Sequence, residues 1–180
     1  LDPNTKYTYS GPDAGVGGKG NARIAPPDSL RLDMAGPLGS KRTSGMVLGD
    51  SAVWVTRQDV LDKIIPSYPL LWAMLGVARR PPADAALTGG VVGDVTAWEY
   101  AVGADTIEYV RTAGKAPTLQ ALVRQEGRVV GRVETLLRLD GSLVSSRLYL
   151  PEGPSRLELT FTGDTTPASF KPEIWNKPER

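Results

Sequence analysis

The chain of 180 residues contains no cysteine and no histidine. These absences exclude disulfide frameworks, cysteine nucleophiles, histidine-containing catalytic triads and most zinc sites. A strong excess of one charge is also lacking, because 21 lysines and arginines face 20 aspartates and glutamates. No strong electrostatic field would therefore gather a nucleic acid. We expect a protein that is not an enzyme, with no catalytic residues, no metal, no cofactor and no nucleic-acid partner.

Long apolar runs are absent as well. No stretch of the chain approaches the roughly 20 apolar residues that a membrane-spanning helix needs. The chain begins at Leu1 rather than at a methionine. A signal or lipid-anchor region preceding Leu1 would fit this start, and we expect that any attachment to a membrane lies outside these residues.

What the sequence does contain is a strand pattern over most of its length. Residues 1–18 are rich in glycine, proline and polar residues without periodicity, which predicts an extended N-terminal arm. Residues 19–166 predict a single domain, because short apolar runs alternate with turn residues throughout. Residues 167–180 contain several prolines and predict an extended C-terminal tail.

The strand pattern predicts a mostly β fold with a short α insertion. About ten segments have strand character, each bounded by glycine, proline or aspartate. They are residues 21–25, 29–35, 43–48, 52–56, 96–102, 106–112, 119–125, 128–139, 143–150 and 156–162. Alternation of apolar and polar residues within them predicts a curved antiparallel sheet with one dry face.

The middle of the chain changes period and predicts a helix. Ser67 is a suitable N-cap, Pro69 fits the first turn and Gly76 fits the end. This helix is apolar on nearly all sides, so it must be buried in protein or inserted into an apolar partner. A further one or two helical turns are expected over residues 59–65, and a loop over 81–93. The short helix is the natural cover for the concave apolar face of the curved sheet.

The segment SLRLDMAGPLG at residues 29–39, with this order of elements, resembles the LolA/LolB-like lipoprotein-carrier families. The resemblance spans roughly residues 20–165. It implies a half-barrel plugged by a helix, with a concave apolar interior that holds acyl chains, and it brings no catalytic residues. It also implies a periplasmic or cell-envelope protein, lipid-anchored at its N-terminal side. Residues 1–18 depart from the family, whose members begin with a long helix across the barrel mouth.

The candidate site is the concave face of this half-barrel. A flexible methionine and broad aromatic surfaces suit a disordered acyl chain. The same side chains would equally serve as ordinary core, and both interpretations stay open. The residues expected to line a lipid cavity are Leu70, Leu71, Trp72, Met74 and Leu75 of the helix, with Leu32, Met34, Trp98 and Tyr100 of the strands.

Two functions follow from these expectations. The first is a carrier or acceptor of lipids or lipoproteins. The second is a structural accessory subunit of a larger membrane-associated complex, which would use the sheet and its two arms for contact. The aromatic residues expected to contact such a partner are Tyr7, Tyr9, Phe170 and Trp175.

Overall fold

The computed structural model describes residues 1–11, 15–25, 28–36, 42–57, 65–80, 83–151, 156–163, 165 and 167–177. Its elements follow one another along the chain as a run of strands interrupted once by a helix. They are β1 (Asn4–Ser10), β2 (Gly15–Ala25), β3 (Ser29–Ala35), β4 (Thr43–Leu48), β5 (Ser51–Val55), α2 (Tyr68–Met74), β6 (Ala86–Val92), β7 (Val95–Val102), β8 (Asp105–Thr112), β9 (Thr118–Gln125), β10 (Arg128–Leu137), β11 (Leu143–Tyr149), β12 (Arg156–Gly163) and the 3₁₀ helix η2 (Pro172–Trp175).

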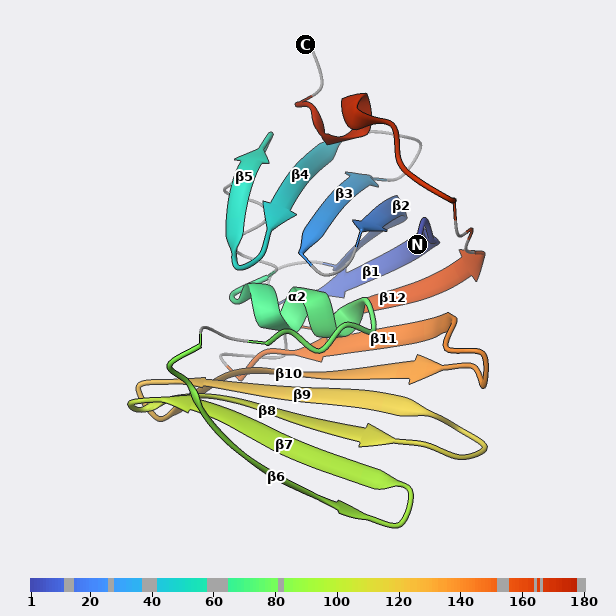
Figure 1. The fold of residues 1–180 in the computed structure, drawn as a ribbon. Coiled ribbons are helices and arrows are strands. Elements are labelled where there is room, and N and C mark those ends of the chain that lie inside the picture. The colour runs from blue at the N-terminus through green and yellow to red at the C-terminus, as the bar shows by residue number, and fades with distance from the viewer. Residues whose placement is uncertain are drawn as a thin grey trace.

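The strands form one 12-stranded sheet in the order β5-β4-β3-β2-β1-β12-β11-β10-β9-β8-β7-β6. Each pair of neighbours is antiparallel. The sheet curves around α2, which lies on its concave side between the two halves (Figure 1). The first and last strands of the chain therefore meet in the middle of the sheet, while β5 and β6 form its two edges. The mostly β prediction, with one curved, unclosed antiparallel sheet and one short helix, is confirmed.

The core lies between the concave face and α2. In β12, Leu157, Leu159 and Phe161 alternate with exposed or half-exposed residues, so that one side of the strand is buried. The helix itself is buried from Leu70 to Met74. A helix with no polar face needs such an enclosed position, because otherwise it would expose apolar surface to water.

Three polar or steric details fix α2 in place. The Trp72 indole Nε1 donates to the carbonyl of Gly49 at 2.8 Å. At the end of the helix, the buried Thr135 Oγ1 donates to the carbonyl of Ala73 at 2.7 Å. Gly131 faces the helix, where a Cβ atom would lie 2.7 Å from Leu70 Cδ1. The last carbonyls of a buried helix need partners, and Thr135 supplies one.

The prediction of an extended N-terminal arm over residues 1–18 is wrong where these residues form strands. Asn4–Ser10 is β1, which pairs with β12 on one side and β2 on the other, and β2 begins at Gly15. Within β1, Thr5 and Tyr7 are buried and alternate with exposed residues. The alternation is only a few residues long and adjoins a glycine-rich stretch, which hid it. The β2 glycines are needed for close packing: a Cβ atom on Gly18 would lie 2.0 Å from the carbonyl oxygen of Ala35.

The expected loop over residues 81–93 is also wrong over most of its length, because Ala86–Val92 forms the edge strand β6. Every residue of β6 is exposed, so its sequence has no apolar and polar alternation to reveal it.

The predicted helix is confirmed at Tyr68–Met74, with proline in its first turn and Gly76 following at φ 75°. Ser67 precedes it in an extended conformation, but its hydroxyl makes no capping hydrogen bond. Of the helical turns expected over residues 59–65, residues 59–64 lie outside the described residues, as do the turn residues 37–41.

Candidate binding site on the concave face

The helix divides the concave face into a filled part and an open part. The five helix residues expected to line a cavity, Leu70, Leu71, Trp72, Met74 and Leu75, are at most 2% exposed. Between Leu71 and the strand residues Leu32 and Met34 the remaining cavity is about 10 Å³, the size of a single water. On this side the helix side chains themselves occupy the space that an acyl chain would need.

The open part lies on β7 and β8, on the other side of α2. Trp98 pairs with Tyr109, and Tyr100 pairs with Ile107, so these four side chains share the concave face. The rings of Trp98 and Tyr109 stack with centroids 5.3 Å apart. Tyr109 is fully buried, whereas Trp98, Tyr100 and Ile107 are only partly buried. The result is an aromatic surface anchored in the core on one side and accessible on the other.

The apolar surface continues onto the edge strand β6. Leu87 pairs with Tyr100, and Val91 pairs with Thr96, which places both side chains on the concave face. They are 61% and 69% exposed. Between them, Gly89 sits against Trp98, where a Cβ atom would lie 2.9 Å from the Trp98 Cβ. We call Leu87, Val91, Trp98, Tyr100 and Ile107 the apolar strip.

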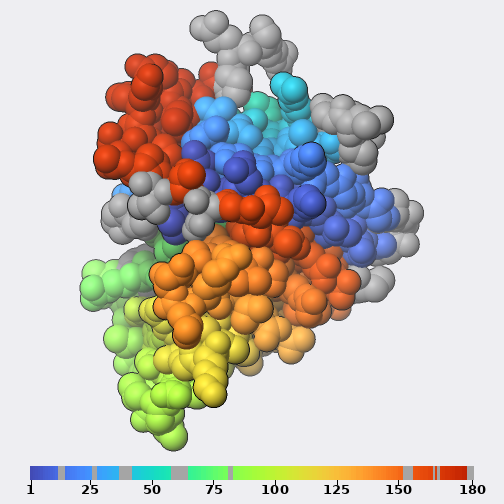
Figure 2. Space-filling view, turned by 90° about the vertical axis from the view of Figure 1, so that its right-hand side faces the viewer, coloured from blue at the N-terminus to red at the C-terminus, as the bar shows by residue number. Residues whose placement is uncertain are grey.

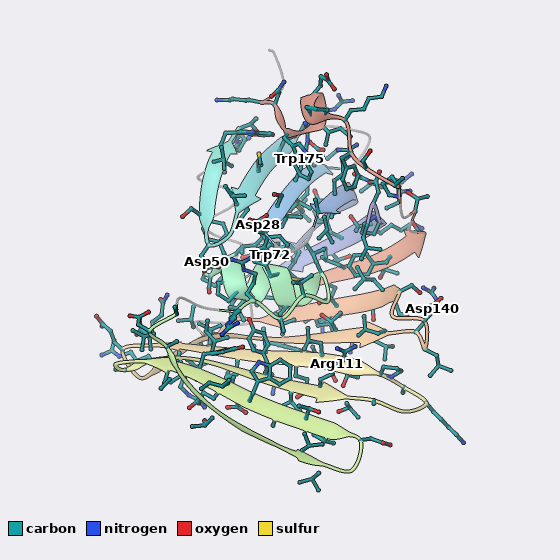
Figure 3. All side chains as sticks on the ribbon, viewed as in Figure 1. Asp28, Asp50, Trp72, Arg111, Asp140 and Trp175 are labelled. Atoms are coloured by element: carbon teal, nitrogen blue, oxygen red, sulfur yellow. The ribbon has the colours of Figure 1, made fainter. Side chains whose placement is uncertain are left out.

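A basic residue marks one end of the strip. Arg111 pairs with Thr96 across β7 and β8 and is exposed (Figure 3). No carboxylate among the described residues pairs with it. The strip is therefore apolar along its length and positively charged at the end near Arg111.

The segment after α2 crosses the concave face beside the helix. The backbone amide of Arg79 donates to the Tyr109 hydroxyl at 3.0 Å. The Arg79 guanidinium lies 5.4 Å from the centre of the Trp72 ring and 3.6 Å from an Asp50 oxygen. Burial raises the pKa of Tyr109 far above its ordinary value, and the Arg79 hydrogen bond opposes this effect only in part. Tyr109 thus stays neutral and joins this segment to the sheet.

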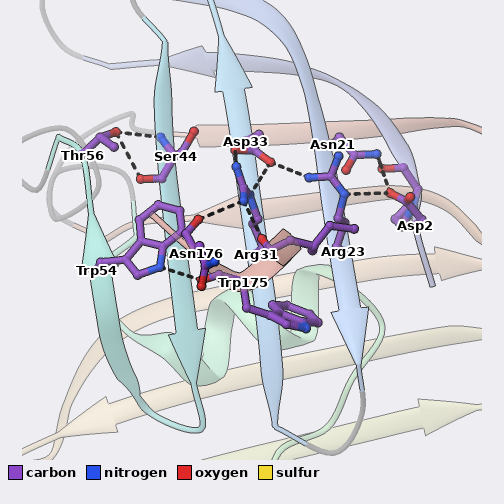
Figure 4. Close-up of polar contacts among 12 residues, drawn as sticks. Asp2, Asn21, Arg23, Arg31, Asp33, Ser44, Trp54, Thr56, Trp175 and Asn176 are labelled. Atoms are coloured by element: carbon purple, nitrogen blue, oxygen red, sulfur yellow. Dashed lines mark hydrogen bonds and ion pairs between the residues drawn. The ribbon is translucent and has the colours of Figure 1, made fainter. Parts of the chain in front are cut away.

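On the convex face, a polar network holds the C-terminal tail (Figure 4). Asp33 accepts hydrogen bonds from Arg23 and Arg31, and Arg31 also donates to the carbonyls of Ile174 and Asn176. Sequence reasoning assigned no role to Arg31 and Asp33. Their alternation with Leu30, Leu32 and Met34 was the available signal, since it placed two opposite charges side by side on one face.

The tail is thereby docked on the sheet, where the space-filling view shows the C-terminal segment against the first strands (Figure 2). The Trp54 indole donates to the carbonyl of Trp175 at 3.0 Å, and the rings of Trp175 and Phe170 meet edge to face at 5.6 Å. Tyr7 lies within the sheet and is only 8% exposed. It is therefore not on a free arm, where it was expected to contact a partner. For Tyr9, Phe170 and Trp175 a partner contact stays a prediction.

No cluster of three acidic, cysteine or histidine residues suited to a metal ion occurs within the described ranges. In the same part of the chain, no helix is both long enough and apolar enough to cross a membrane.

Comparison with known proteins identifies the fold. No family model and no curated protein matches the chain. A solved structure from Vibrio parahaemolyticus, described as an outer membrane lipoprotein-sorting protein domain, matches with a TM-score of 0.58 at 9% identity, covering 97% of this chain and 88% of that one. An exported protein of YmcC-like fold from Bacteroides fragilis matches with a TM-score of 0.32 at 10% identity, covering 89% and 93%. The first match shows that this chain shares the fold of that Vibrio structure.

Proposed function

We propose that this protein is a cell-envelope carrier or acceptor that binds an acyl chain of a lipid or lipoprotein on the apolar strip. The observation that carries the proposal is the exposure of Leu87 and Val91 beside the half-buried ring of Trp98. A contiguous apolar surface left open in a curved sheet is typical of a ligand or partner site.

The physical chemistry of the strip suits an amphiphile. Each methylene group moved from water onto this surface contributes about 0.8 kcal/mol when fully buried, so even part of an acyl chain gives useful affinity. Arg111 at one end supplies a positive charge for an anionic headgroup. The chain would lie along Leu87, Tyr100 and Ile107, with its headgroup toward Thr96 and Arg111.

The fold supports the same assignment, because the matched Vibrio structure is described as a lipoprotein-sorting domain. In this proposal the helix cluster of Leu70, Leu71, Trp72, Met74 and Leu75 with Leu32 and Met34 forms the packed wall of the site. A longer ligand would displace part of that wall. Attachment to the membrane through a lipid anchor outside these residues belongs to the proposal as well.

The test compares two adjacent valines on β6. Val91 faces the strip, while Val92 pairs with Val95, points to the other face and is 83% exposed. We expect Val91→Glu to weaken the binding of a fluorescent fatty acid by about tenfold or more, because the new carboxylate would lie beside Thr96, at the headgroup end of the strip, and would repel the anionic headgroup. Val92→Glu introduces the same charge at the same edge and should bind like the unchanged protein.

Equal affinities for the two variants, or no fatty-acid binding by the unchanged protein, would refute the carrier function. Native mass spectrometry of protein purified from its own membrane fraction adds an independent measurement, since a carrier retains a stoichiometric lipid.

A second function, an accessory subunit of a membrane-associated complex, is favoured by the edge strand β6. Its sequence, ALTGGVV, contains no charge and no proline, which are the usual protections against pairing with another chain. A partner strand could add to this edge by backbone hydrogen bonds. A lipid-free protein that always purifies within a larger assembly would support this alternative.

A further inference from the structure

A second cavity, of about 730 Å³, lies over β2, β3 and the start of β4 on the convex face, next to the docked tail. Among the described residues, its charged lining consists of five basic side chains and one carboxylate: Lys19, Arg23, Arg31, Arg42, Lys177 and Asp33. We propose that this cavity binds the phosphate group of a phosphate-bearing molecule. The proposal does not depend on the acyl-chain site, which is on the opposite face of the sheet.

The floor of the cavity is a fixed ion-pair network. One Asp33 oxygen lies 2.7 Å from Arg23 Nη1 and 2.9 Å from Arg31 Nε, and the other lies 3.1 Å from Arg31 Nη2. Burial raises the pKa of Asp33, but hydrogen bonds from Arg31 and Ser44 and the two arginine charges outweigh it, so that the pKa lies below its usual value. Asp33 is therefore ionised and fully engaged by the two arginines.

The remaining basic groups have no such partner. No carboxylate in the described ranges forms an ion pair with Lys19, Arg42 or Lys177. All three side chains belong to exposed residues around the cavity. The cavity thus has uncompensated positive charge from three separate segments: β2, the residue before β4, and the tail.

Strand register explains how these charges surround a space. Lys19 pairs with Ala35 of β3, and Arg42 directly precedes Thr43, which pairs with the neighbouring Met34. The small side chain of Ala35 therefore lies between two long basic ones. On the other side, Lys6 of β1 pairs directly with Lys19, and like charges facing each other across two strands are destabilising. A bound anion would relieve this repulsion.

A phosphate group fits this lining better than a single carboxylate does. A phosphate monoester carries close to two negative charges near neutral pH and offers several acceptor oxygens. Arginine and lysine together provide a planar fork and a point charge for such oxygens. The cavity volume is in the range of small-molecule sites, so the ligand is a molecule bearing the phosphate rather than the free ion. That molecule is either a soluble phosphate compound or a phospholipid headgroup.

The experiment titrates the full chain with glycerol 3-phosphate by calorimetry, and in parallel measures co-sedimentation with phosphatidylcholine vesicles that contain or lack phosphatidic acid. The test variant is Lys19→Gln with Arg42→Gln. The control is Lys115→Gln with Arg128→Gln, two exposed residues outside this cavity that remove the same charge. Neither change in the test variant breaks an ion pair of the described structure, so the fold is expected to persist.

We expect saturable binding that the test variant weakens about tenfold or more and the control leaves nearly unchanged. Binding of glycerol 3-phosphate without vesicles identifies a soluble ligand, whereas binding only to vesicles with phosphatidic acid identifies a lipid headgroup. Either result supports the proposal. An equal loss in the test variant and the control, or no binding in either assay, would overturn it. Because Val91→Glu leaves this cavity intact, failure of the acyl-chain site and failure of this site are separate outcomes.

Discussion

At the scale of single residues, Tyr109 connects three parts of the molecule. Its ring stacks on Trp98 of the apolar strip, its hydroxyl accepts the amide of Arg79, and its whole side chain is buried. A tyrosine in this position stays protonated, because burial raises the pKa of Tyr109 more than the nearby Arg79 charge lowers it. The free energy of unfolding should therefore decrease at alkaline pH.

We predict that stability falls as the pH rises above about 10, the ordinary pKa of tyrosine. Burial raises the pKa of Tyr109, so above that pH the unfolded chain loses the proton while the folded chain keeps it. Tyr109→Phe costs about 1 kcal/mol near neutral pH, because it removes one hydrogen bond. The stability difference between the two proteins should shrink above about pH 10. Urea unfolding across this range measures it, and a constant difference would contradict the prediction.

The ion-pair network on the convex face also shows how much of a contact can be predicted from the sequence of a single strand. Arg31 and Asp33 could be assigned to the solvated face of their strand from alternation with Leu30 and Leu32. The hydrogen bond from Arg31 to Ile174 could not be predicted, because it joins residues far apart in the chain through a backbone carbonyl. A carbonyl acceptor has no side-chain signature in the sequence.

At the scale of elements, the position of α2 depends on Gly131 of β10. A side chain at this position would enter the space of Leu70 on the helix. The tight approach lets α2 pack closely against β10 on the filled part of the concave face. The helix was predictable from Pro69, Gly76 and the apolar run between them, but its contact with a glycine was not.

We predict that Gly131→Ala destabilises the protein by about 1–3 kcal/mol, because the new Cβ atom would lie 2.7 Å from Leu70 Cδ1. The matched control is Gly90→Ala on β6, where no heavy atom of another described residue, apart from the two chain neighbours, lies within 4 Å of the position that a Cβ atom would take. That change should be neutral or slightly stabilising. Chemical denaturation of both variants measures the difference, and equal midpoints would show that α2 does not pack as described.

Strands with an alternating pattern were predicted from sequence, and the two strands that lack a clear one were missed. In β1 the buried Thr5 and Tyr7 are too few to establish a period next to a glycine-rich segment. In β6 all residues are exposed, so pairing with β7 defines the strand rather than burial. The apolar strip was predicted only in part, because Trp98 and Tyr100 were recognised while Leu87 and Val91 lay in the supposed loop.

At the scale of the whole molecule, β1 joins two halves of the sheet. It lies between β2 and β12, so β1 and β12 connect the half that ends at β5 with the half that ends at β6. The same region anchors the start of the chain, since the amino group of Leu1 donates to the carbonyl of Ile24 at 2.9 Å.

We predict that removal of residues 1–10 abolishes cooperative folding, because it takes a central strand out of the sheet and exposes the backbone of both neighbours. Removal of residues 171–180 should leave a protein that still unfolds cooperatively, since the described part of this segment contains η2 and no strand. Thermal unfolding followed by near-ultraviolet circular dichroism separates the two cases. A sharp transition in the chain lacking residues 1–10 would mean that the two halves hold together without β1.

The meeting of the first and last strands also determines how the molecule responds to a mechanical load. Asn4 at the start of β1 pairs with Gly163 at the end of β12, so both chain ends leave the sheet at the same end of this strand pair. A force pulling on the two ends would first detach the tail from Arg31 and Trp54. It would then break the β1–β12 hydrogen bonds one pair after another, from Asn4 toward Ser10, as a zipper opens. Tension on the ends therefore acts on the centre of the sheet while its outer hairpins carry little of the force.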